Sequence, residues 1–548
     1  MPIALGGVAA LVALTVVTVR IVAADAGGCA GGIAVRIVAT PEIGPVLEGI
    51  AEQWIATKPA VNGKCVHVSV ASEPSASVAS GLTVYAGRAI DVAARPALTP
   101  KEDALPTVWV PDSTAWLSRV QTVDGTAFDP DVRSVATSPV VVAMTEADAR
   151  KVGWPAQRLP IAALKGLLSG PGGLKLGVAE PRRETASLAA TMVLGDALAT
   201  TDAELPALVR TLRGVVHTGS TAELLRSFGP NLNAGPASEQ AVLAYDAGKP
   251  TLKLVAVHLD PASPMLDYPF AIRSGLPRET TQAAEAFRDA LLEPEAVEAL
   301  SEAYFRTSTC EVGQGFPLSS ASTGEAVACT PISDPQKVAR TLGLWTAANS
   351  PSRTLALFDV TSSMARVMQT SAGGATRVQV MVQAAQRGLD LFTSDSIVGM
   401  WAFASQHQEV LPIADLSPES KARFKQAMQN AAPLPTNQAS LYSAMLAAYK
   451  VMQDGYDPAR PNIIVVLTDG GDSNAGGANL QRFQLDLQRL AEATKPIRVI
   501  LIGIDVTPTD AADLDAIAKA AGGGYFPLTS PEQIQTIFLK ALLRVGPV

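Results

Sequence analysis

The chain has 548 residues, of which 48% are hydrophobic and 17% are charged, and its formal net charge is −8. This length predicts two or three domains, and the composition is typical of packed globular domains rather than of extensive disorder. The modest negative charge excludes the basic face that nucleic-acid binding requires, so we expect no nucleic-acid partner. The four histidines are widely spaced, which argues against a histidine-based zinc site or hydrolase.

The first 28 residues predict a membrane or export segment. The chain is largely apolar from Pro2 to Ala24, and Arg20 is the only charged residue in that run. A run of this length suits a membrane-spanning helix, so we expect a single-pass anchor with the bulk of the chain outside the cell. Two alternatives stay open: a cleaved signal peptide ending near "VAADA", which would release a secreted protein, and lipid attachment at Cys29 in "AGGC".

The four cysteines agree with export. None forms a CxxC pair, and an even, dispersed set behind an export segment predicts two disulfides. We expect the pairs Cys29–Cys65 and Cys310–Cys329, because each pair flanks one local unit. The alternative is four buried free thiols.

Residues 30–335 alternate between strand-like and helix-like patterns. The stretch "PEIGPVLEGIAEQWIATKP" has helical apolar spacing, and β-rich runs are found in "IAVRIVAT", "CVHVSVAS", "DVAARP", "PTVWVPDS", "SPVVVAMT", "LKLGVAEP" and "TLKLVAVHL". Alternation of this kind predicts a mostly parallel sheet with helices on both faces. Some three hundred residues exceed one simple sheet, so we expect two α/β lobes.

A second alternating series begins after a Pro-, Ser- and Asn-containing connector at 336–352. We assign residues 353–548 to a doubly wound α/β domain of the Rossmann type. Its predicted strands are "TLALF", "SIVGMWAFAS", "NIIVVLTDG", "IRVILIGID" and "GYFPLT", and its predicted helices are 377–392, 441–453, 478–493 and 530–544.

Polar side chains follow two of these predicted strands. Asp359, Thr361 and Ser363 alternate after "LALF", and Asp469 follows "VVLT". Carboxyl ends of parallel strands meet at one sheet edge, where ligands of such folds bind. A carboxylate with hydroxyl groups suits Mg²⁺ or Mn²⁺. Helix capping is the alternative role for Thr361 or Ser363 taken alone.

"DVTSSM" and "VVLTDGGDSN" together resemble the von Willebrand factor type A (VWA) domain and its metal-ion-dependent adhesion site. The resemblance covers about residues 353–545 and implies that Asp359, Thr361, Ser363 and Asp469 bind the metal. It departs at "ASLYSAM", where Ala439 stands in place of the metal-binding Thr of the family. Ser440 is a possible substitute ligand if the loop shifts, as are Thr436 and Asn437.

Residues 33–330 resemble the two-lobed bacterial extracellular solute-binding proteins of the periplasmic type, through "PTVWVPDSTAW", "SPVVVAM", "ASEQAVLAY" and "MLDYPFAI". Solutes of that fold bind at strand ends and helix N-termini between the lobes. The residues at the matching positions are Thr40, Asp112, Ser113, Thr185 and Ser187, and they would suit a small polar or anionic solute. The alternative is that they are ordinary helix caps.

Several neighbouring residues have plain structural interpretations. Trp109, Trp116 and Tyr268 are expected to be core aromatics rather than sugar-stacking platforms. Arg182 and Arg183 are expected to be a solvated pair rather than an anion site.

Together these patterns predict a membrane-anchored binding or adhesion protein of the bacterial envelope that engages a protein partner through a degenerate metal site. The alternative is a transport-linked solute receptor with the VWA domain as a docking module. We expect no enzymatic activity and no organic cofactor. A metal-assisted hydrolase would need a general base, and Asp472 is the only nearby carboxylate in the sequence.

Overall fold

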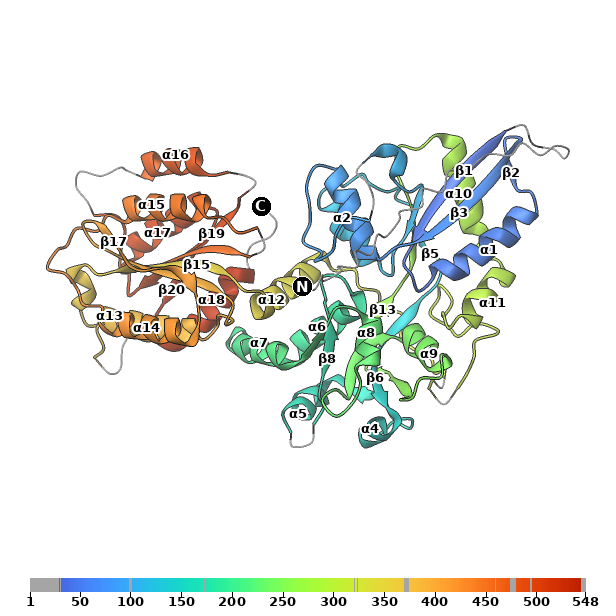
Figure 1. Cartoon of the computed structure of the whole chain (residues 1–548), viewed down its shortest axis with the longest axis horizontal. Coiled ribbons are helices and arrows are strands. Elements are labelled where there is room, and N and C mark those ends of the chain that lie inside the picture. The colour runs from blue at the N-terminus through green and yellow to red at the C-terminus, as the bar shows by residue number, and fades with distance from the viewer. Residues whose placement is uncertain are drawn as a thin grey trace, which may run out of the picture.

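The computed structural model describes residues 29, 31–97, 101–170, 173–319, 321–322, 324–368, 374–458, 460–473, 480–492 and 495–543. A two-lobed N-terminal half and a C-terminal α/β domain are joined by helix α12 (Figure 1). The predicted anchor at 1–28 lies outside the described residues. Within the described part of the chain, no helix has the length and apolar character needed to cross a membrane.

The first lobe is built on a six-stranded sheet with the order β2-β3-β1-β4-β14-β5. Strand β1 pairs in parallel with β3 and β4, and its alternate side chains Val35 and Ile37 are buried. The elements of this lobe are β1 (Gly32–Ala39), α1 (Gly44–Ala56), β2 (Ala60–Val61), β3 (Lys64–Ser72), α2 (Ser75–Tyr85), β4 (Val108–Val110), α3 (Thr114–Gln121), β5 (Arg133–Ser134), β14 (Pro269–Ile272), α10 (Arg278–Ala290) and α11 (Pro294–Glu302).

The second lobe has an antiparallel centre. Strand β6 lies between β10 and β11 and is antiparallel to both, and β13 pairs with it as well. The elements are β6 (Ser138–Thr145), α4 (Glu146–Lys151), β7 (Leu159–Pro160), α5 (Leu164–Ser169), β8 (Gly177–Ala179), α6 (Thr185–Leu198), α7 (Leu205–Gly214), β9 (Val216–Thr218), α8 (Thr221–Arg226), β10 (Ala234–Ser238), α9 (Glu239–Ala247), β11 (Leu254–Val257), β12 (Leu259–Asp260) and β13 (Met265–Leu266).

Two predictions for this half are wrong. The second lobe is not mostly parallel, because local periodicity reports which residues are buried and not the direction in which the chain re-enters a sheet. The segment "DVAARP" (91–96) contains no strand. Its arginine and aspartate make it more polar than the neighbouring strands, and Asp91 instead takes part in contacts between the lobes.

The C-terminal domain has a six-stranded sheet with the order β17-β16-β15-β18-β19-β20, parallel except for β17. The elements are β15 (Arg353–Asp359), α13 (Arg377–Leu389), β16 (Ile397–Phe403), β17 (His407–Asp415), α14 (Pro418–Gln429), α15 (Leu441–Asp454), β18 (Asn462–Thr468), α16 (Leu480–Leu490), β19 (Ile497–Ile504), α17 (Pro508–Ala520), β20 (Gly524–Leu528) and α18 (Ile534–Leu543). All five predicted strands are present. Strand β17 was not predicted: it is an exposed edge strand, and a proline, Pro412, interrupts its short apolar run.

The predicted connector 336–352 is mostly helical. Helix α12 (Pro335–Asn349) begins at Asp334, whose carboxylate accepts hydrogen bonds from the amides of Gln336 and Lys337. The apolar side chains of Leu344 and Trp345 are buried. Proline is well tolerated in the first helical turn, so the proline that suggested a break starts the helix instead.

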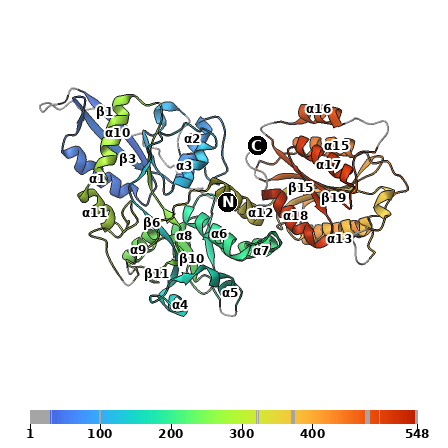
Figure 2. The same ribbon diagram turned by 180° about the vertical axis from the view of Figure 1, so that it is seen from behind.

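Helix α12 lies between the second lobe and the C-terminal domain (Figure 2). Its buried apolar side chains belong to one hydrophobic core that also includes residues of both. Polar contacts accompany this core. Arg213 of α7 donates to the Ala348 carbonyl at 2.6 Å, and Lys540 of α18 pairs with Asp202 at 2.5 Å. The C-terminal domain therefore packs directly against the second lobe, through both apolar and polar contacts.

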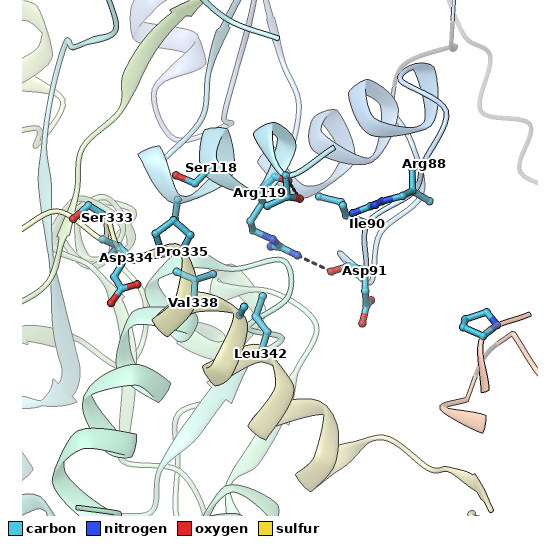
Figure 3. A pocket seen from close by; sticks show the side chains of 16 residues that line it. Arg88, Ile90, Asp91, Ser118, Arg119, Ser333, Asp334, Pro335, Val338 and Leu342 are labelled. Atoms are coloured by element: carbon cyan, nitrogen blue, oxygen red, sulfur yellow. Dashed lines mark hydrogen bonds between the residues drawn. The ribbon is translucent and has the colours of Figure 1, made fainter. Parts of the chain in front are cut away.

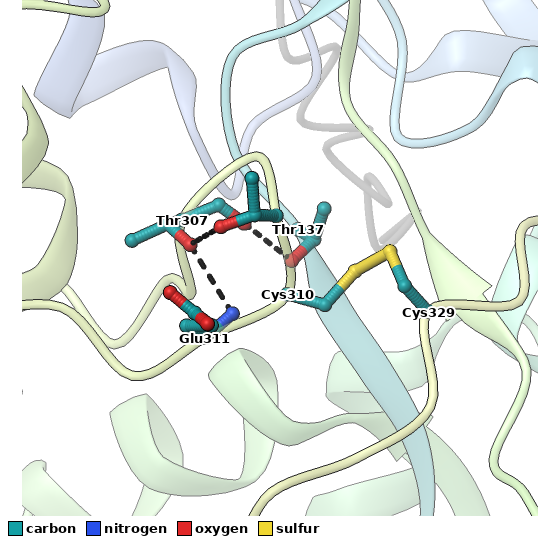
Figure 4. The surroundings of a disulfide bond; sticks show 6 residues. Thr137, Thr307, Cys310, Glu311 and Cys329 are labelled. Carbon is teal, nitrogen blue, oxygen red and sulfur yellow. Dashed lines mark hydrogen bonds between the residues drawn. A yellow bond between two sulfur atoms is a disulfide. The ribbon is translucent and has the colours of Figure 1, made fainter.

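Both predicted disulfides are present, Cys29–Cys65 and Cys310–Cys329. Near the second, Thr137 donates its hydroxyl to the Thr307 carbonyl at 2.8 Å (Figure 4). The first disulfide uses the sulfur of Cys29, so it is incompatible with a lipid attached to that atom.

Candidate functional site

Asp359 ends β15 at the carboxyl edge of the C-terminal sheet, and only 1% of it is exposed. Its Oδ1 accepts hydrogen bonds from the amide of Thr361 at 2.9 Å and from the hydroxyl of Thr361 at 2.7 Å. Its Oδ2 accepts from the Thr468 hydroxyl at 2.6 Å. Burial raises the pKa of Asp359, and the hydrogen bonds from Thr468 and Thr361 oppose that rise.

A row of closely spaced side-chain oxygens extends from Asp359 to the second aspartate. The hydroxyls of Thr361 and Ser363 are 2.8 Å apart, and the Ser363 hydroxyl donates to Oδ1 of Asp469 at 2.9 Å. The structure therefore brings together all four residues that the sequence nominated as metal ligands: Asp359, Thr361, Ser363 and Asp469. They belong to the loops after β15 and β18, which are adjacent parallel strands.

The loop that should supply a further ligand lies against the first loop. The amide of Ser362 donates to the Thr436 carbonyl at 2.8 Å, and the Ser362 hydroxyl donates to the side-chain oxygen of Asn437. Ser440, the possible substitute for the missing threonine, donates its hydroxyl to the Ser405 carbonyl at 2.7 Å. Ala439 itself is buried.

Arg377 is a residue of this site that sequence reasoning missed. Its Nη1 lies 2.7 Å from Oδ2 of Asp469, and its Nε and Nη2 lie 3.1 and 3.0 Å from Oδ2 of Asp505. Burial opposes the charged form, but the hydrogen bonds to Asp469 and Asp505 raise the pKa of Arg377. One signal was available: a cation in the first turn of a helix opposes the helix dipole, which calls for a nearby acidic partner.

Asp472 has a structural role at the start of α15, where its carboxylate accepts from the amide of Tyr442 at 2.9 Å. The oxygen donors of Asp359, Thr361, Ser363 and Asp469 fit a hard divalent cation. A bound cation would also need water ligands, because Ala439 has no side-chain oxygen to coordinate it. Groups of three or more His, Cys, Asp or Glu side chains arranged to hold a metal are absent from the described residues.

In the N-terminal half, Asp112 and Thr185 meet where the two lobes face each other. The Asp112 carboxylate accepts from the hydroxyls of Ser75 at 3.0 Å and of Thr185. Burial raises its pKa to about 6. Nearby Glu42, which the sequence analysis did not select, accepts from the Tyr268 hydroxyl at 2.5 Å. Burial and then the charge of Asp112 raise the pKa of Glu42 to about 7.

The other three nominated solute residues have local partners. Ser113 caps α3 by accepting from the Ala115 amide at 3.2 Å, and Ser187 accepts from the Ala179 amide at 3.1 Å. Thr40 is buried at the end of β1, where its amide donates to the Val110 carbonyl at 2.9 Å. For Ser113 the capping alternative matches the observed contact.

The arginine pair is not merely solvated. Arg182 pairs with Glu180 at 2.8 Å and with Asp91 at 3.4 Å, and Arg183 donates to the Gly219 carbonyl. The prediction of a solvated pair is therefore wrong, because the fold supplies acceptors from distant segments. The aromatic prediction is confirmed, since the large aromatic side chains in question are at most 2% exposed: Trp109, Trp116 and Tyr268.

Comparison with known proteins agrees with this geometry. Residues 35–306 match the family model described as bacterial extracellular solute-binding protein, and residues 355–540 match the von Willebrand factor type A domain. The chain joins an extracellular solute-binding domain to a VWA domain. The resemblance stated from the sequence is confirmed in order and in approximate extent.

The chain is similar to a relative over most of its length, and to solved structures from bacteria over single domains. The uncharacterized protein MT1884 from Mycobacterium tuberculosis (strain CDC 1551 / Oshkosh) is 26% identical over 543 residues, covering 91% of this chain and 75% of the relative. The sulfate-binding protein SubI from M. tuberculosis H37Rv is 18% identical, with a TM-score of 0.33, and the match covers 51% of this chain and 87% of that chain. A von Willebrand factor type A structure from Catenulispora acidiphila is 18% identical, with a TM-score of 0.29, and the match covers 36% and 42%.

A pocket of about 400 Å³ lies where the solute-binding domain, α12 and the VWA domain approach each other (Figure 3). Arg119, Val338 and Leu342 line it, and Pro496 of the VWA domain closes one side. The Arg119 guanidinium donates to the main-chain carbonyls of Asp91 at 2.6 Å and Arg182 at 3.1 Å. The Arg119 guanidinium therefore already has hydrogen-bond acceptors from both lobes. The pocket is a gap between the packed solute-binding domain, α12 and VWA domain.

Proposed function

We propose that this protein is a membrane-anchored binding protein of the bacterial cell envelope, and that its VWA domain engages a protein partner at the carboxyl edge of its sheet. Export is supported by the extracellular solute-binding domain and the two disulfides. Solute-binding and VWA domains are generally non-catalytic, so binding is the activity to test.

The observation that carries the proposal is the row of closely spaced side-chain oxygens of Asp359, Thr361, Ser363 and Asp469, in which Thr361 donates to Asp359 and Ser363 donates to Asp469. In the proposal these residues hold Mg²⁺ or Mn²⁺, and a carboxylate of the partner completes the coordination. When bound, the ion would supply the positive charge that attracts an acidic side chain. The fold of this chain positions and orients the four oxygen-bearing side chains before the ion binds.

The proposal is tested by photo-crosslinking in cells from an exposed position beside the site. A photoreactive residue at Gln438 is expected to form a specific adduct, and one at exposed Lys450 on α15 serves as the matched control. The yield of this adduct should fall when EDTA is added and in the Asp359→Asn variant. Thermal unfolding checks that the variant is folded. Equal crosslinking from both positions, or an adduct indifferent to EDTA and to the substitution, would contradict metal-dependent engagement.

The second candidate is a transport-linked solute receptor, and the paired carboxyl groups of Glu42 and Asp112 between the lobes favour it. They would repel an anion, so we propose a polar or cationic solute that donates hydrogen bonds, in place of the anionic alternative. A thermal-shift screen of the full chain against amines, amino acids, sugars and oxyanions should give stabilising hits among the hydrogen-bond donors and cations. Hits confined to oxyanions would contradict this choice of solute.

A further inference from the structure

The VWA metal site already contains a fixed cation. Arg377 contacts Asp469 through Nη1 at 2.7 Å and Asp505 through Nε and Nη2 at 3.1 and 3.0 Å. The three side chains are largely shielded from water, with exposed fractions of 13% for Arg377, 6% for Asp469 and 14% for Asp505. A pair so shielded is screened much less by salt than a surface pair.

Two elements outside the metal-binding loops hold this guanidinium in place. Arg377 is the first residue of α13, and the capping box of Thr376 and Gln379 fixes the start of that helix. Asp505 follows β19 with a φ of +52°, a conformation that a non-glycine residue adopts at a cost. Its main-chain carbonyl also accepts from Nη2 of Arg377 at 2.9 Å. The surrounding fold therefore specifies the position of the charge.

The consequence is that each carboxylate oxygen of Asp359 and Asp469 has a donor without any metal. Thr361 and Thr468 donate to the two oxygens of Asp359, while Ser363 and Arg377 donate to the two oxygens of Asp469. A divalent ion must share Asp469 with a guanidinium, and like charges at this range repel one another strongly in a partly buried site.

We propose that Arg377 is a competing internal cation of the VWA metal site, so that divalent-ion binding requires displacement of its guanidinium from Asp469. This inference rests on the metal site of the proposed function and adds its regulation. Together with the missing ligand at Ala439, Arg377 sets the site to bind metal weakly. A change that draws α13 or the Asp505 turn away from Asp469 would strengthen metal binding.

The test measures Mn²⁺ binding to the full-length protein by calorimetry and electron paramagnetic resonance. Arg377→Gln removes the charge while keeping a hydrogen-bonding side chain, and it should lower the Kd for Mn²⁺ about tenfold or more. Arg387→Gln is the matched control: it removes the same charge from the same helix, where Arg387 pairs with exposed Glu532. Arg377→Lys retains the charge and should gain less than Arg377→Gln.

Each outcome decides the inference. An unchanged or weaker affinity in Arg377→Gln overturns it, as does an equal gain in Arg387→Gln, which would indicate a bulk electrostatic effect. If Arg377→Gln binds Mn²⁺ and the wild-type protein does not, the inference is supported. The metal-dependent function proposed for the wild-type protein is then contradicted. If Arg377→Gln does not fold, Mg²⁺ titration of wild-type protein with ¹⁵N-labelled arginine replaces it. The Arg377 Nε–H resonance should then shift with metal occupancy, and an unmoved resonance overturns the inference.

Discussion

At the scale of single residues, the sequence identified the hydroxyl and carboxylate groups of the VWA site, but it did not identify the charged residues that pair with them. The alternation of Asp359, Thr361 and Ser363 places them on one side of a tight loop, and Asp469 follows the neighbouring strand. Arg377 and Asp505 escaped prediction because their contact joins residues 128 positions apart. Nothing in the local pattern around Arg377 specifies which carboxylate it meets.

Glu42 gives a residue-scale prediction about pH. Its pKa is about 7 in the folded protein, raised from the ordinary value of 4.5 first by burial and then by Asp112. The native state therefore binds a proton more readily than the unfolded state between about pH 4.5 and 7, so this group lowers stability as pH rises through that window. The penalty is fully present above pH 7.

Substituting Glu42→Gln should remove this penalty while leaving an oxygen to accept from Tyr268. We expect the melting temperature of the variant to exceed that of wild type at pH 8, with the difference shrinking toward zero or below at pH 5. Differential scanning calorimetry at pH 5, 6, 7 and 8 measures it. Asp112 titrates in both proteins, so its contribution to the melting temperature largely cancels from the difference between them. A difference independent of pH would contradict the assigned ionisation of Glu42.

At the scale of elements, apolar runs located the buried strands well. Strands β15, β16, β18, β19 and β20 begin and end within two residues of their predicted runs. The four strands inside the sheet (β15, β16, β18 and β19) are covered on both faces and show continuous apolar character. Strand β17 was missed because it is an exposed edge strand whose apolar run is short and contains Pro412. The connector was not predicted to be the helix α12, because its Pro and Asn residues, which suggested a break, stand at the two ends of the helix.

At the scale of the whole molecule, the position of the VWA domain depends on α12. Trp345 is 2% exposed within the core that spans the second lobe and the VWA domain, and its ring lies 4.9 Å from that of His217. Motion of the second lobe relative to the first should therefore carry the VWA domain with it. If the two proposals hold, solute binding between the lobes would then change how the proposed metal site is presented to a partner.

This coupling predicts the effect of Trp345→Ala. The substitution should lower the free energy of unfolding by about 3–5 kcal/mol, as for large aromatic deletions in other cores. It should also separate one calorimetric transition shared by the second lobe and the VWA domain into two. Trp401→Ala is the matched control, since Trp401 is also buried and stacked on a histidine, His407, but belongs to a core within the VWA domain. Two transitions in Trp401→Ala, or one in Trp345→Ala, would contradict the shared core.

The sequence by itself determined the two-domain α/β organisation and the four oxygen-bearing residues of the VWA site, and it predicted two disulfides whose pairing the structure confirms. These features depend on local periodicity, on short motifs and on cysteine spacing, all of which are written along the chain. Only the tertiary structure decided the antiparallel centre of the second lobe, the shared core around α12 and the guanidinium of Arg377 beside Asp469. Those depend on which distant segments the folded chain brings together, and so on packing and charge pairing in three dimensions.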